Sequence, residues 1–509
     1  MKNKIWSLLW VGLMVIFASD IVFNNRIVLE ETDDNLIFRV GEFTNENTEV
    51  IETNIALSMI EHAFTTLLEC CGSNDFMENG KGYNIYKHSM QLSVIDGLDT
   101  IILYHYLKNN IVSKNMFRRT LKAILNNNII HDQFISLFEM NIRITGGLIG
   151  GVTLIEYFNI TMDKMLTSQL IQKAGEFVDL EMNYYSNNKD IPYAYANLKT
   201  NERHYQKWSS NKALLSEIGS HQLEFKALDQ FVNKMGLKYR NYPFSTRSDD
   251  VFNAILMKSD TLYHCFIDTD SGEFDLSSDI SLGAYSDSFY EYILKMFILT
   301  KQEIYKNKFI QVATHIESEL IQEYFIGNET VYLLKSTKSN AFDHLTCFAG
   351  GMFGLASTVI PEHAQHYLLL AHRLTKGCFA VYSSFSTGLG PDTCTPLMTS
   401  ENEFKCTTVD GYYKLRPELV ESNYYLYKIT KNRVYRDMNE KIAFSIEKYC
   451  KTDFGYVEVQ VEDQTLGKQQ DSWFLAETLK YLLLTFEEND LLPLNEFVFN
   501  TEAHPFKIY

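Results

Sequence analysis

The sequence predicts an all-α protein in which helical hairpins repeat around a ring. Three observations favour this class. Apolar residues recur at helical spacing from Ile55, Leu57 and Ile60 onward, whereas strand-like alternation is scarce. Only 8 prolines and 25 glycines are spread over 509 residues, so long helices meet few breakers. An acidic residue also recurs at or near the start of successive predicted helices.

These acidic residues divide the chain into seven units, each with a polar turn, an apolar helix and a second helix. Successive units lie about 40 to 80 residues apart, which is the room that one helical hairpin and its loops occupy. Such units could close into a ring with one carboxylate per unit pointing inward. Acids at helix starts also simply complement the helix dipole, and this alternative stays open for each single residue. The markers are Asp96 with Asp99, Glu139, Glu217, Asp287, Asp343 with His344, Glu418 and Glu477.

The composition favours one large domain and excludes a nucleic-acid partner. Hydrophobic residues make up 46% of the chain, and no Pro/Gly/Ser-rich stretch marks an internal linker. The net charge is -18, and the 46 Lys and Arg residues form no long basic run that could bind phosphates. The excess acid either serves solubility or lines a site for a neutral sugar or a cation.

The N-terminus carries a short apolar segment. Lys2 and Lys4 precede an uncharged run from Ile5 to Ser19, and acidic residues dominate the other side, which orients the N-terminus to the cytoplasm. The run is short for a membrane span of roughly 20 apolar residues, so a cleaved signal peptide is the alternative. Because no small-x-small cleavage site follows, we expect a type II signal-anchor over 1–19, a polar stem over 20–50 and the main domain over 51–509.

Either targeting signal delivers the main domain to the secretory lumen. The two sequons that begin at Asn159 and Asn328 agree with this compartment, and both are expected glycosylation sites. Eight cysteines in a chain of this length are no small disulfide scaffold, but a lumenal compartment permits one or two bridges.

Two segments combine acids with partners suited to a sugar site. Glu139 and Arg143 lie four residues apart on one predicted helical face, and Gly146-Gly147 after them allow close helix packing. An acid beside a fixed cation is typical of a carbohydrate site and equally typical of a surface ion pair. Asp287 and Glu291 share a face flanked by aromatic residues, and like charges there need a cation, a ligand or solvent to compensate them. A solvated face with a buried aromatic stripe is the alternative.

The C-terminal third adds further acids. Pro417 stands at a probable first helical turn that carries Glu418 and Glu421 with Arg416 as a built-in counter-charge, and Glu477 follows an aromatic pair. The segment 500–505 supplies only oxygen and imidazole groups, which suit a hard cation such as calcium better than zinc. Glycoside hydrolysis needs one carboxylic acid and one carboxylate. The residues alone therefore indicate a lumenal helical protein, with a glycosidase as one candidate function.

At these segments the sequence closely resembles glycoside hydrolase family 47, the class I α-mannosidases, from about Ile55 to Phe506. The family fold is an (α/α)7 helical barrel with minor β-hairpin elements, which agrees with the seven units. The ordered blocks that carry the resemblance are Ile95-Asp96-Gly97-Leu98-Asp99-Thr100, Asn141-Ile142-Arg143, Gln222-Leu223-Glu224-Phe225, Asp287-Ser288-Phe289-Tyr290-Glu291-Tyr292, Leu415-Arg416-Pro417-Glu418, Phe474-Leu475-Ala476-Glu477-Thr478-Leu479-Lys480-Tyr481 and Val498-Phe499-Asn500-Thr501-Glu502-Ala503-His504-Pro505.

The resemblance implies a role for each matching residue. Glu139 corresponds to the general acid, and Asp287 and Glu418 correspond to the two candidates for the base, of which Glu418 is favoured. Thr501 corresponds to the residue that binds Ca²⁺ through its backbone and hydroxyl oxygens. The family inverts the anomeric configuration without a covalent intermediate. Residues expected to hold the terminal mannose or calcium-bound waters are Arg143, Glu217, His344, Arg416, Glu421, Trp473, where the family usually has Phe, Glu477 and Glu502.

The resemblance also implies a disulfide and a substrate. Cys347 and Cys378 match a disulfide of the processing enzymes, and the remaining cysteines are unassigned. The implied activity is calcium-dependent removal of α-1,2-linked mannose from high-mannose N-glycans by a monomer in the endoplasmic reticulum or Golgi membrane. Tyr285 departs from the Arg and Leu of the two main enzyme types, so the order in which branches are trimmed stays open.

A mannose-binding surveillance factor that uses the same barrel with little turnover is the alternative function. Such a lectin would be free to lose its acid or its base. Intact Glu139, Asp287, Glu418 and Thr501 therefore favour the enzyme.

Overall fold

A computed structural model describes residues 27–32, 35–40, 49–71, 76–78, 81–83, 88–160, 164–185, 191–401 and 403–508. The predicted signal-anchor over 1–19 lies outside the described residues. Two antiparallel strands, β1 (Ile27–Thr32) and β2 (Asn35–Val40), fall within the segment expected as a stem. The stem and domain boundaries stay predictions.

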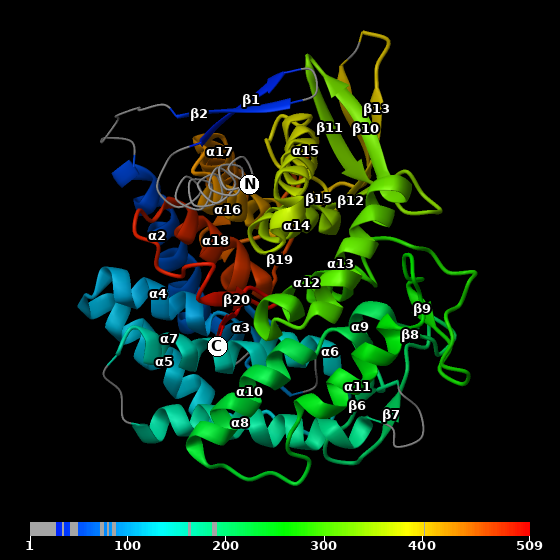
Figure 1. The fold of residues 1–509 in the computed structure, drawn as a ribbon. Helices are drawn as coiled ribbons and strands as arrows, with labels where there is room; N and C mark the ends of the chain where they lie inside the picture. Colours follow the sequence, from blue (N-terminus) through cyan, green and yellow to red (C-terminus); the bar gives the residue numbers. More distant parts are fainter. Residues whose placement is uncertain are drawn as a thin grey trace, which may run out of the picture.

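Seven inner helices form a closed ring within the described residues (Figure 1). Each inner helix packs on its neighbour in the ring, and the turn before the last of them contacts the first, so the ring closes. The inner helices are α4 (Leu98–Lys108), α7 (Gly146–Tyr157), α10 (Gln222–Met235), α12 (Asp287–Thr300), α14 (Phe348–Val359), α16 (Glu418–Thr430) and α18 (Leu479–Phe486).

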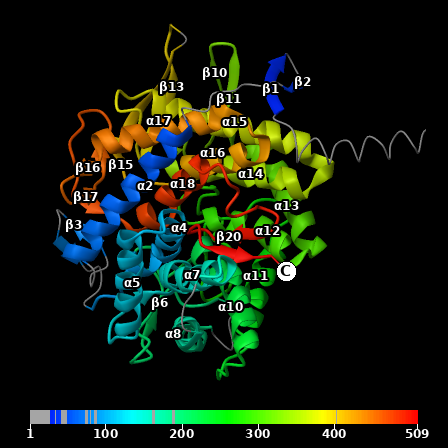
Figure 2. The ribbon, with the colours of Figure 1, turned by 90° about the vertical axis from the view of Figure 1, so that its left-hand side faces the viewer.

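A second layer of helices surrounds this ring. Each inner helix packs on the helix that follows it in the chain, except that α18 packs on the first long helix, α2, as the turned view also shows (Figure 2). The ends of the domain are therefore joined by burial of the first helix against the last. The outer helices are α5 (Ile111–Asn126), α8 (Lys164–Glu181), α11 (Ser245–Leu256), α13 (Glu303–His315), α15 (Ala364–Ser383), α17 (Arg433–Tyr449) and α2 (Glu49–Thr66).

The sequence explains which helices lie inside. In α12 every residue from Ser288 to Leu299 is buried, as expected for a helix covered on all sides. In α17, by contrast, the buried residues recur at three- and four-residue spacing, which leaves one face to solvent. Gly147 allows α7 to approach the preceding unit closely, because a Cβ there would lie 2.5 Å from the carbonyl oxygen of Ile95. This confirms the prediction of close packing at the Gly146-Gly147 pair.

Short strands occupy the connections between helices and form small antiparallel sheets. The most consequential of these is the C-terminal hairpin of β20 (Phe497–Phe499) and β21 (Pro505–Lys507), which enters the ring and contacts α12 and α7 (Figure 1). The others are β3 (Phe76–Glu78), β4 (Lys81–Tyr83), β5 (Ile135–Ser136), β6 (Tyr195–Ala196), β7 (Arg203–His204), β8 (Ala213–Leu214), β9 (Phe266–Ile267), β10 (Ile321–Ile326), β11 (Glu329–Leu334), β12 (Phe342–Asp343), β13 (Thr393–Met398), β14 (Phe404–Asp410), β15 (Tyr412–Tyr413), β16 (Lys451–Thr452), β17 (Gly455–Tyr456), β18 (Val459–Gln460) and β19 (Gln469–Gln470).

Two disulfides cross-link segments of the chain near α14 and α15. The expected bridge between Cys347 and Cys378 is present and joins the turn before α14 to α15. A second bridge between Cys394 and Cys406, left unassigned from the sequence, joins β13 to β14.

The surface features bear on the targeting predictions. Asn159, just after α7, and Asn328, in the turn between β10 and β11, are both exposed, and their glycosylation stays a prediction. No single helix in the described ranges is long and apolar enough to span a membrane, and only the pair His344–Val359 and Pro361–Ser383, bent by 117°, passes that test together.

Candidate active site

A pocket of about 420 Å³ opens inside the ring, where helix starts from different units converge. Glu139 and Glu217 lie in the first turns of α6 (Leu137–Met140) and α9 (Leu215–Gly219), and Asp287 and Glu418 begin α12 and α16. Glu477 lies in a π-helical turn, η7 (Phe474–Thr478), directly before α18. All five line the pocket.

The prediction of one inward carboxylate in every unit is wrong for two units. Asp96 and Asp99, at the end of α3 (Leu92–Asp96) and the start of α4, are fully buried in ion pairs with His504 and Lys480 outside the pocket lining. Asp343 accepts hydrogen bonds from the backbone of Ala284 and Leu345, so it serves the loop structure instead.

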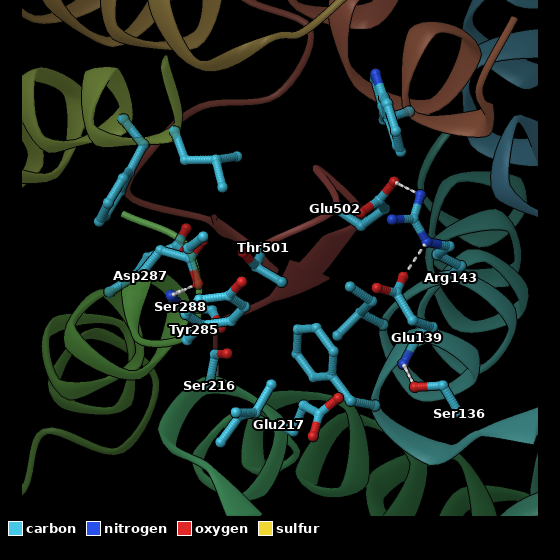
Figure 3. Close-up of a pocket in the computed structure, with 18 of the residues that line it drawn as sticks. Ser136, Glu139, Arg143, Ser216, Glu217, Tyr285, Asp287, Ser288, Thr501 and Glu502 are labelled. Atoms are coloured by element: carbon cyan, nitrogen blue, oxygen red, sulfur yellow. Dashed lines mark hydrogen bonds and ion pairs between the residues drawn. The ribbon is translucent and has the colours of Figure 1, made fainter. Parts of the chain in front are cut away.

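One side of the pocket presents an acid with a fixed cation. Glu139 keeps 42% of its side chain exposed, and the Nε of Arg143 donates to its Oε2 at 2.8 Å, as the spacing predicts. Arg143 also donates to Glu502 at 2.6 Å and to Ser472 at 2.9 Å. Burial alone would lower the pKa of Arg143, but Glu502, Glu139 and Asp96 raise that pKa well above its ordinary value. The guanidinium therefore stays charged. Figure 3 shows Arg143 between Glu139 and Glu502.

Glu217 lies beneath this acid. Gln206 donates to its Oε1 at 2.7 Å, and its Oε2 has no hydrogen-bond partner among the described residues. Burial raises the pKa of Glu217 to about 7, and the charge of Glu139 adds to the shift. Gln206 was missed from the sequence, because it stands in an irregular loop without any motif.

Asp287 and Glu418 supply further carboxyls to the pocket. Figure 3 shows Asp287 and Glu139 on opposite sides of the pocket, with Thr501 between them. Burial raises the pKa of Asp287 to about 8, and Asp343, Glu291 and Glu418 add negative charge. The Oε2 of Glu418 lies 2.8 Å from Nδ1 of His344, whose Nε2 lies 2.6 Å from the hydroxyl of Tyr382. This contact brings His344 to Glu418 from outside the pocket lining, although neither of the two atoms forms a hydrogen bond in the described chain.

Glu291, which the sequence left without a role, also lines the pocket. It shares a face with Asp287, and Lys295, one helical turn further, forms a buried ion pair with it. The compensating cation expected for these like charges is therefore in part a lysine of the same helix. Lys295 also donates to the backbone oxygen of Asn500 at 3.3 Å.

Three further carboxyls, those of Glu421, Glu477 and Glu502, line the pocket. Burial raises the pKa of Glu421 to about 8, with Glu291 adding to the shift. Burial likewise raises the pKa of Glu477 and of Glu502 well above the ordinary value, and Glu502 adds to the shift of Glu477. Arg143 opposes the shift of both without removing it. A bound cation would favour the ionised form of these carboxyls.

Thr501 lies at the turn of the C-terminal hairpin and lines the pocket beside these acids. No group of three His, Cys, Asp or Glu side chains in the described residues has the geometry of a metal cage. A hard cation bound mainly by backbone, hydroxyl and water oxygens needs no such cage. The residues present therefore fit an oxygen-ligated cation at Thr501.

Two aromatic regions complete the walls. The guanidinium carbons of Arg143 and Arg416 each lie 5.3 Å from the ring centroid of Trp473, whose Nε1–H donates to the carbonyl oxygen of Lys414 at 3.0 Å. Arg416 donates to Asp392 at 2.5 Å, and the nearby charge of Glu418, the acid expected beside it, also raises the pKa of Arg416. At the rim, Tyr285 has a φ of +81° and is 43% exposed, and its ring lies 5.3 Å from that of Trp208.

Of the site residues expected from the sequence, His344 alone lies outside the pocket lining in the described chain. The others come together around one sugar-sized hollow, with an acid on one side and carboxylates on the other. A helical barrel whose pocket gathers carboxyls in this way is typical of glycoside hydrolases.

Comparison with known proteins makes the assignment specific. The sequence profile described as Glycosyl hydrolase family 47 matches residues 59–508, so the chain belongs to this family. The chain is 32% identical over 427 residues to mannosyl-oligosaccharide alpha-1,2-mannosidase IA of Spodoptera frugiperda, covering 82% of this chain and 60% of that protein. It is 30% identical over 470 residues to mannosyl-oligosaccharide 1,2-alpha-mannosidase IA of Sus scrofa, covering 88% of this chain and 67% of that protein. The match thus spans about two thirds or less of the length of these relatives.

A solved structure confirms the fold. The alpha-1,2-mannosidase from Trichoderma reesei superposes with a TM-score of 0.79 at 22% identity, over 90% of this chain and 99% of that chain. The predicted (α/α)7 helical barrel with minor β-hairpins is therefore correct.

Proposed function

We propose that this protein is a calcium-dependent, inverting α-1,2-mannosidase that trims terminal mannose from high-mannose N-glycans in the secretory pathway. The pocket carries the proposal, because Glu139 with its fixed arginine faces Asp287 and Glu418 across a hollow of about 420 Å³. The names of the family relatives supply the substrate class.

Glu139 is the proposed general acid. Its exposed carboxyl can reach a glycosidic oxygen in the pocket, and Arg143 holds its orientation. Glu418 is the proposed base, since it lines the pocket and its Oε2 lies 2.8 Å from Nδ1 of His344. Asp287 is the second candidate for the base. In an inverting mechanism the base activates a water on the face of the sugar opposite to the acid, so no covalent intermediate forms.

Calcium is the proposed cofactor, with Thr501 as its direct protein ligand through backbone and hydroxyl oxygens. When bound, the ion would orient sugar hydroxyls and the attacking water and compensate the charge of the surrounding acids. The pocket residues proposed to hold the terminal mannose or ordered waters are Arg143, Glu217, Arg416, Glu421, Trp473, Glu477 and Glu502, and His344, outside the pocket lining, is proposed to act through Glu418.

The location belongs to the same proposal. A signal-anchor over 1–19, a stem over 20–50 and a catalytic domain over 51–509 would place a monomeric enzyme in the lumen of the endoplasmic reticulum or the Golgi. The exposed sequons at Asn159 and Asn328 are compatible with that compartment.

The test is a time course of glycan products. The full chain is incubated with a high-mannose glycan in calcium and in a chelator, with Glu139→Gln as the matched variant. We expect stepwise loss of mannose in calcium, no loss in chelator and at least about 100-fold slower loss with Glu139→Gln. Tight glycan binding without mannose release would support the lectin alternative and overturn the enzyme, and full turnover in chelator would overturn the cofactor.

A further inference from the structure

The turn that carries Thr501 is fixed by the side-chain amide of Asn500. Its Oδ1 accepts hydrogen bonds from the backbone N–H groups of Glu502 at 3.0 Å and His504 at 2.8 Å. Its Nδ2 donates to the carbonyl oxygen of Ile142 at 3.0 Å and to Oε1 of Glu224 at 2.8 Å. The amide therefore has two acceptor and two donor bonds, which fill its capacity and define its orientation.

Tyr292 and Glu224 hold the same turn from the helices around it. The hydroxyl of Tyr292, on α12, accepts a hydrogen bond from the backbone N–H of Thr501 at 3.3 Å and donates to Oε1 of Glu224, on α10, at 2.6 Å. One oxygen of Glu224 thus accepts bonds from both Tyr292 and Asn500. Tyr292 and Glu224 are fully buried, and neither lines the pocket in the described chain.

This connection matters because a single residue is the proposed protein ligand of the ion. When one residue supplies the ligand oxygens, the orientation of its backbone determines whether they point into the pocket. Groups that orient a ligand commonly change metal affinity without touching the metal. We propose that Tyr292 and Glu224 are positioning residues that hold the backbone of Thr501 in the orientation that binds calcium. This inference rests on the proposed cofactor.

The helix α12 offers a matched pair of tyrosines for the test. Tyr290, two residues before Tyr292, is also fully buried. Its hydroxyl accepts a hydrogen bond from the backbone N–H of Tyr263 at 2.9 Å and donates to the carbonyl oxygen of Tyr263 at 3.2 Å. Tyr292→Phe and Tyr290→Phe therefore remove the same group from the same helix. Of the two hydroxyls, only that of Tyr292 forms a hydrogen bond with Thr501.

Calcium affinity of the full chain is measured by titration calorimetry, and thermal unfolding is measured in chelator. We expect Tyr292→Phe to weaken calcium binding by about tenfold, whereas Tyr290→Phe changes it by less than about twofold. The two melting temperatures in chelator should fall by similar amounts, because each variant loses one buried hydroxyl.

Variants of Glu224 provide the second measurement. Glu224→Gln keeps a carbonyl oxygen that can accept the bonds from Tyr292 and Asn500, so calcium affinity should stay within about threefold of wild type. Glu224→Leu removes both bonds at similar volume and should weaken calcium binding by about tenfold or more.

The outcomes separate the inference from the cofactor assignment. Equal calcium affinity of Tyr292→Phe and Tyr290→Phe, with wild type binding calcium, would overturn the positioning role and leave the cofactor in place. A wild-type chain that binds no calcium would overturn both. If Tyr292→Phe does not fold, equal affinities of Glu224→Gln and Glu224→Leu would still reject the inference.

Discussion

Two groups of buried charges lie side by side in the ring and differ in how they are compensated. The paired cluster consists of Asp96, Asp99, Lys480 and His504. The pocket acids are Asp287, Glu421, Glu477 and Glu502. Arg143 contacts both groups, since it lies 3.5 Å from Asp96 and 2.6 Å from Glu502.

The paired cluster is neutralised inside the protein. Lys480 lies 2.8 Å from Asp99, and His504 bridges Asp99 at 2.9 Å and Asp96 at 3.0 Å, with all four side chains fully buried. Burial would raise the pKa of Asp96, but His504 and Arg143 bring it below its ordinary value. Burial would lower the pKa of His504, but Asp99 and Asp96 raise it. Contacts among these four residues hold the C-terminal hairpin against α3, α4 and α18.

The pocket acids have less compensation: Arg143 pairs with Glu502 without removing its shift, and burial raises the pKa of all four acids. This difference indicates which buried charges stabilise the fold and which are compensated only when a ligand binds. A compensated charge stabilises the protein only as part of its pair, whereas an uncompensated one costs stability until a ligand arrives.

Removing a pocket carboxyl should abolish function and spare the fold. We expect Glu418→Gln to slow mannose release by about 10²- to 10⁴-fold, because the water would lose its base. Its melting temperature in chelator should equal or exceed that of wild type. Exposed Glu401→Gln, between β13 and β14, is the control and should be neutral in both assays. Robust turnover by Glu418→Gln would transfer the base role to Asp287.

Breaking the paired cluster should instead destabilise the fold. Lys480→Met leaves Asp99 buried with less compensation, so the free energy of unfolding in urea should fall by about 3–5 kcal/mol. Lys507→Met removes a half-exposed pair with Glu496 and should cost less than about 1 kcal/mol. Equal small effects of the two substitutions would mean that the cluster does not hold the hairpin.

The dependence of stability on pH should also distinguish the pocket acids from the paired cluster. The pKa of Asp287 and of Glu421 is about 8 in the folded protein, whereas an unfolded Asp or Glu titrates near 4. Between these values the unfolded chain binds fewer protons, so stability in chelator should fall as pH rises from about 5 to 8. Melting temperatures across this range check the slope, which should be smaller in Glu421→Gln and in calcium. A flat profile in chelator would contradict the lack of compensation.

The smallest changes in stability and turnover are expected for a substitution of Trp473, which contacts Arg143, the arginine shared by both groups. Trp473→Phe keeps an aromatic ring and loses the 3.0 Å hydrogen bond to Lys414, so we expect a loss of about 1 kcal/mol of stability and turnover within a few fold. Exposed Trp208→Phe is the control for stability and should be neutral. A loss of turnover beyond about 100-fold in Trp473→Phe would show that the indole itself is required.

The sequence predicts features that depend on local spacing. Glu139 and Arg143 pair as their four-residue spacing indicates, and acids mark the starts of α12 and α16 because helix N-termini favour them. The family resemblance then assigned roles that spacing could not. Without it, Asp287 could equally have been a solvated surface acid.

Features that depend on contacts distant in sequence were not predictable. His504 belongs to a segment expected to offer cation ligands, yet it pairs with Asp96 and Asp99, about 400 residues earlier. The bridge between Cys394 and Cys406 depends on the register of β13 with β14, which spacing alone does not define. The ion pair of Lys295 was not predictable, because nothing in its position on an apolar helix indicates a buried partner.

Inversion by this protein is tested most directly by the anomer of mannose that the full chain releases, as measured by proton NMR from the first minutes of the reaction. It predicts that β-mannose appears first in calcium, that the α anomer grows only by later mutarotation, and that Glu139→Gln releases almost none. Initial release of α-mannose, or no mannose from wild type in calcium, would contradict it.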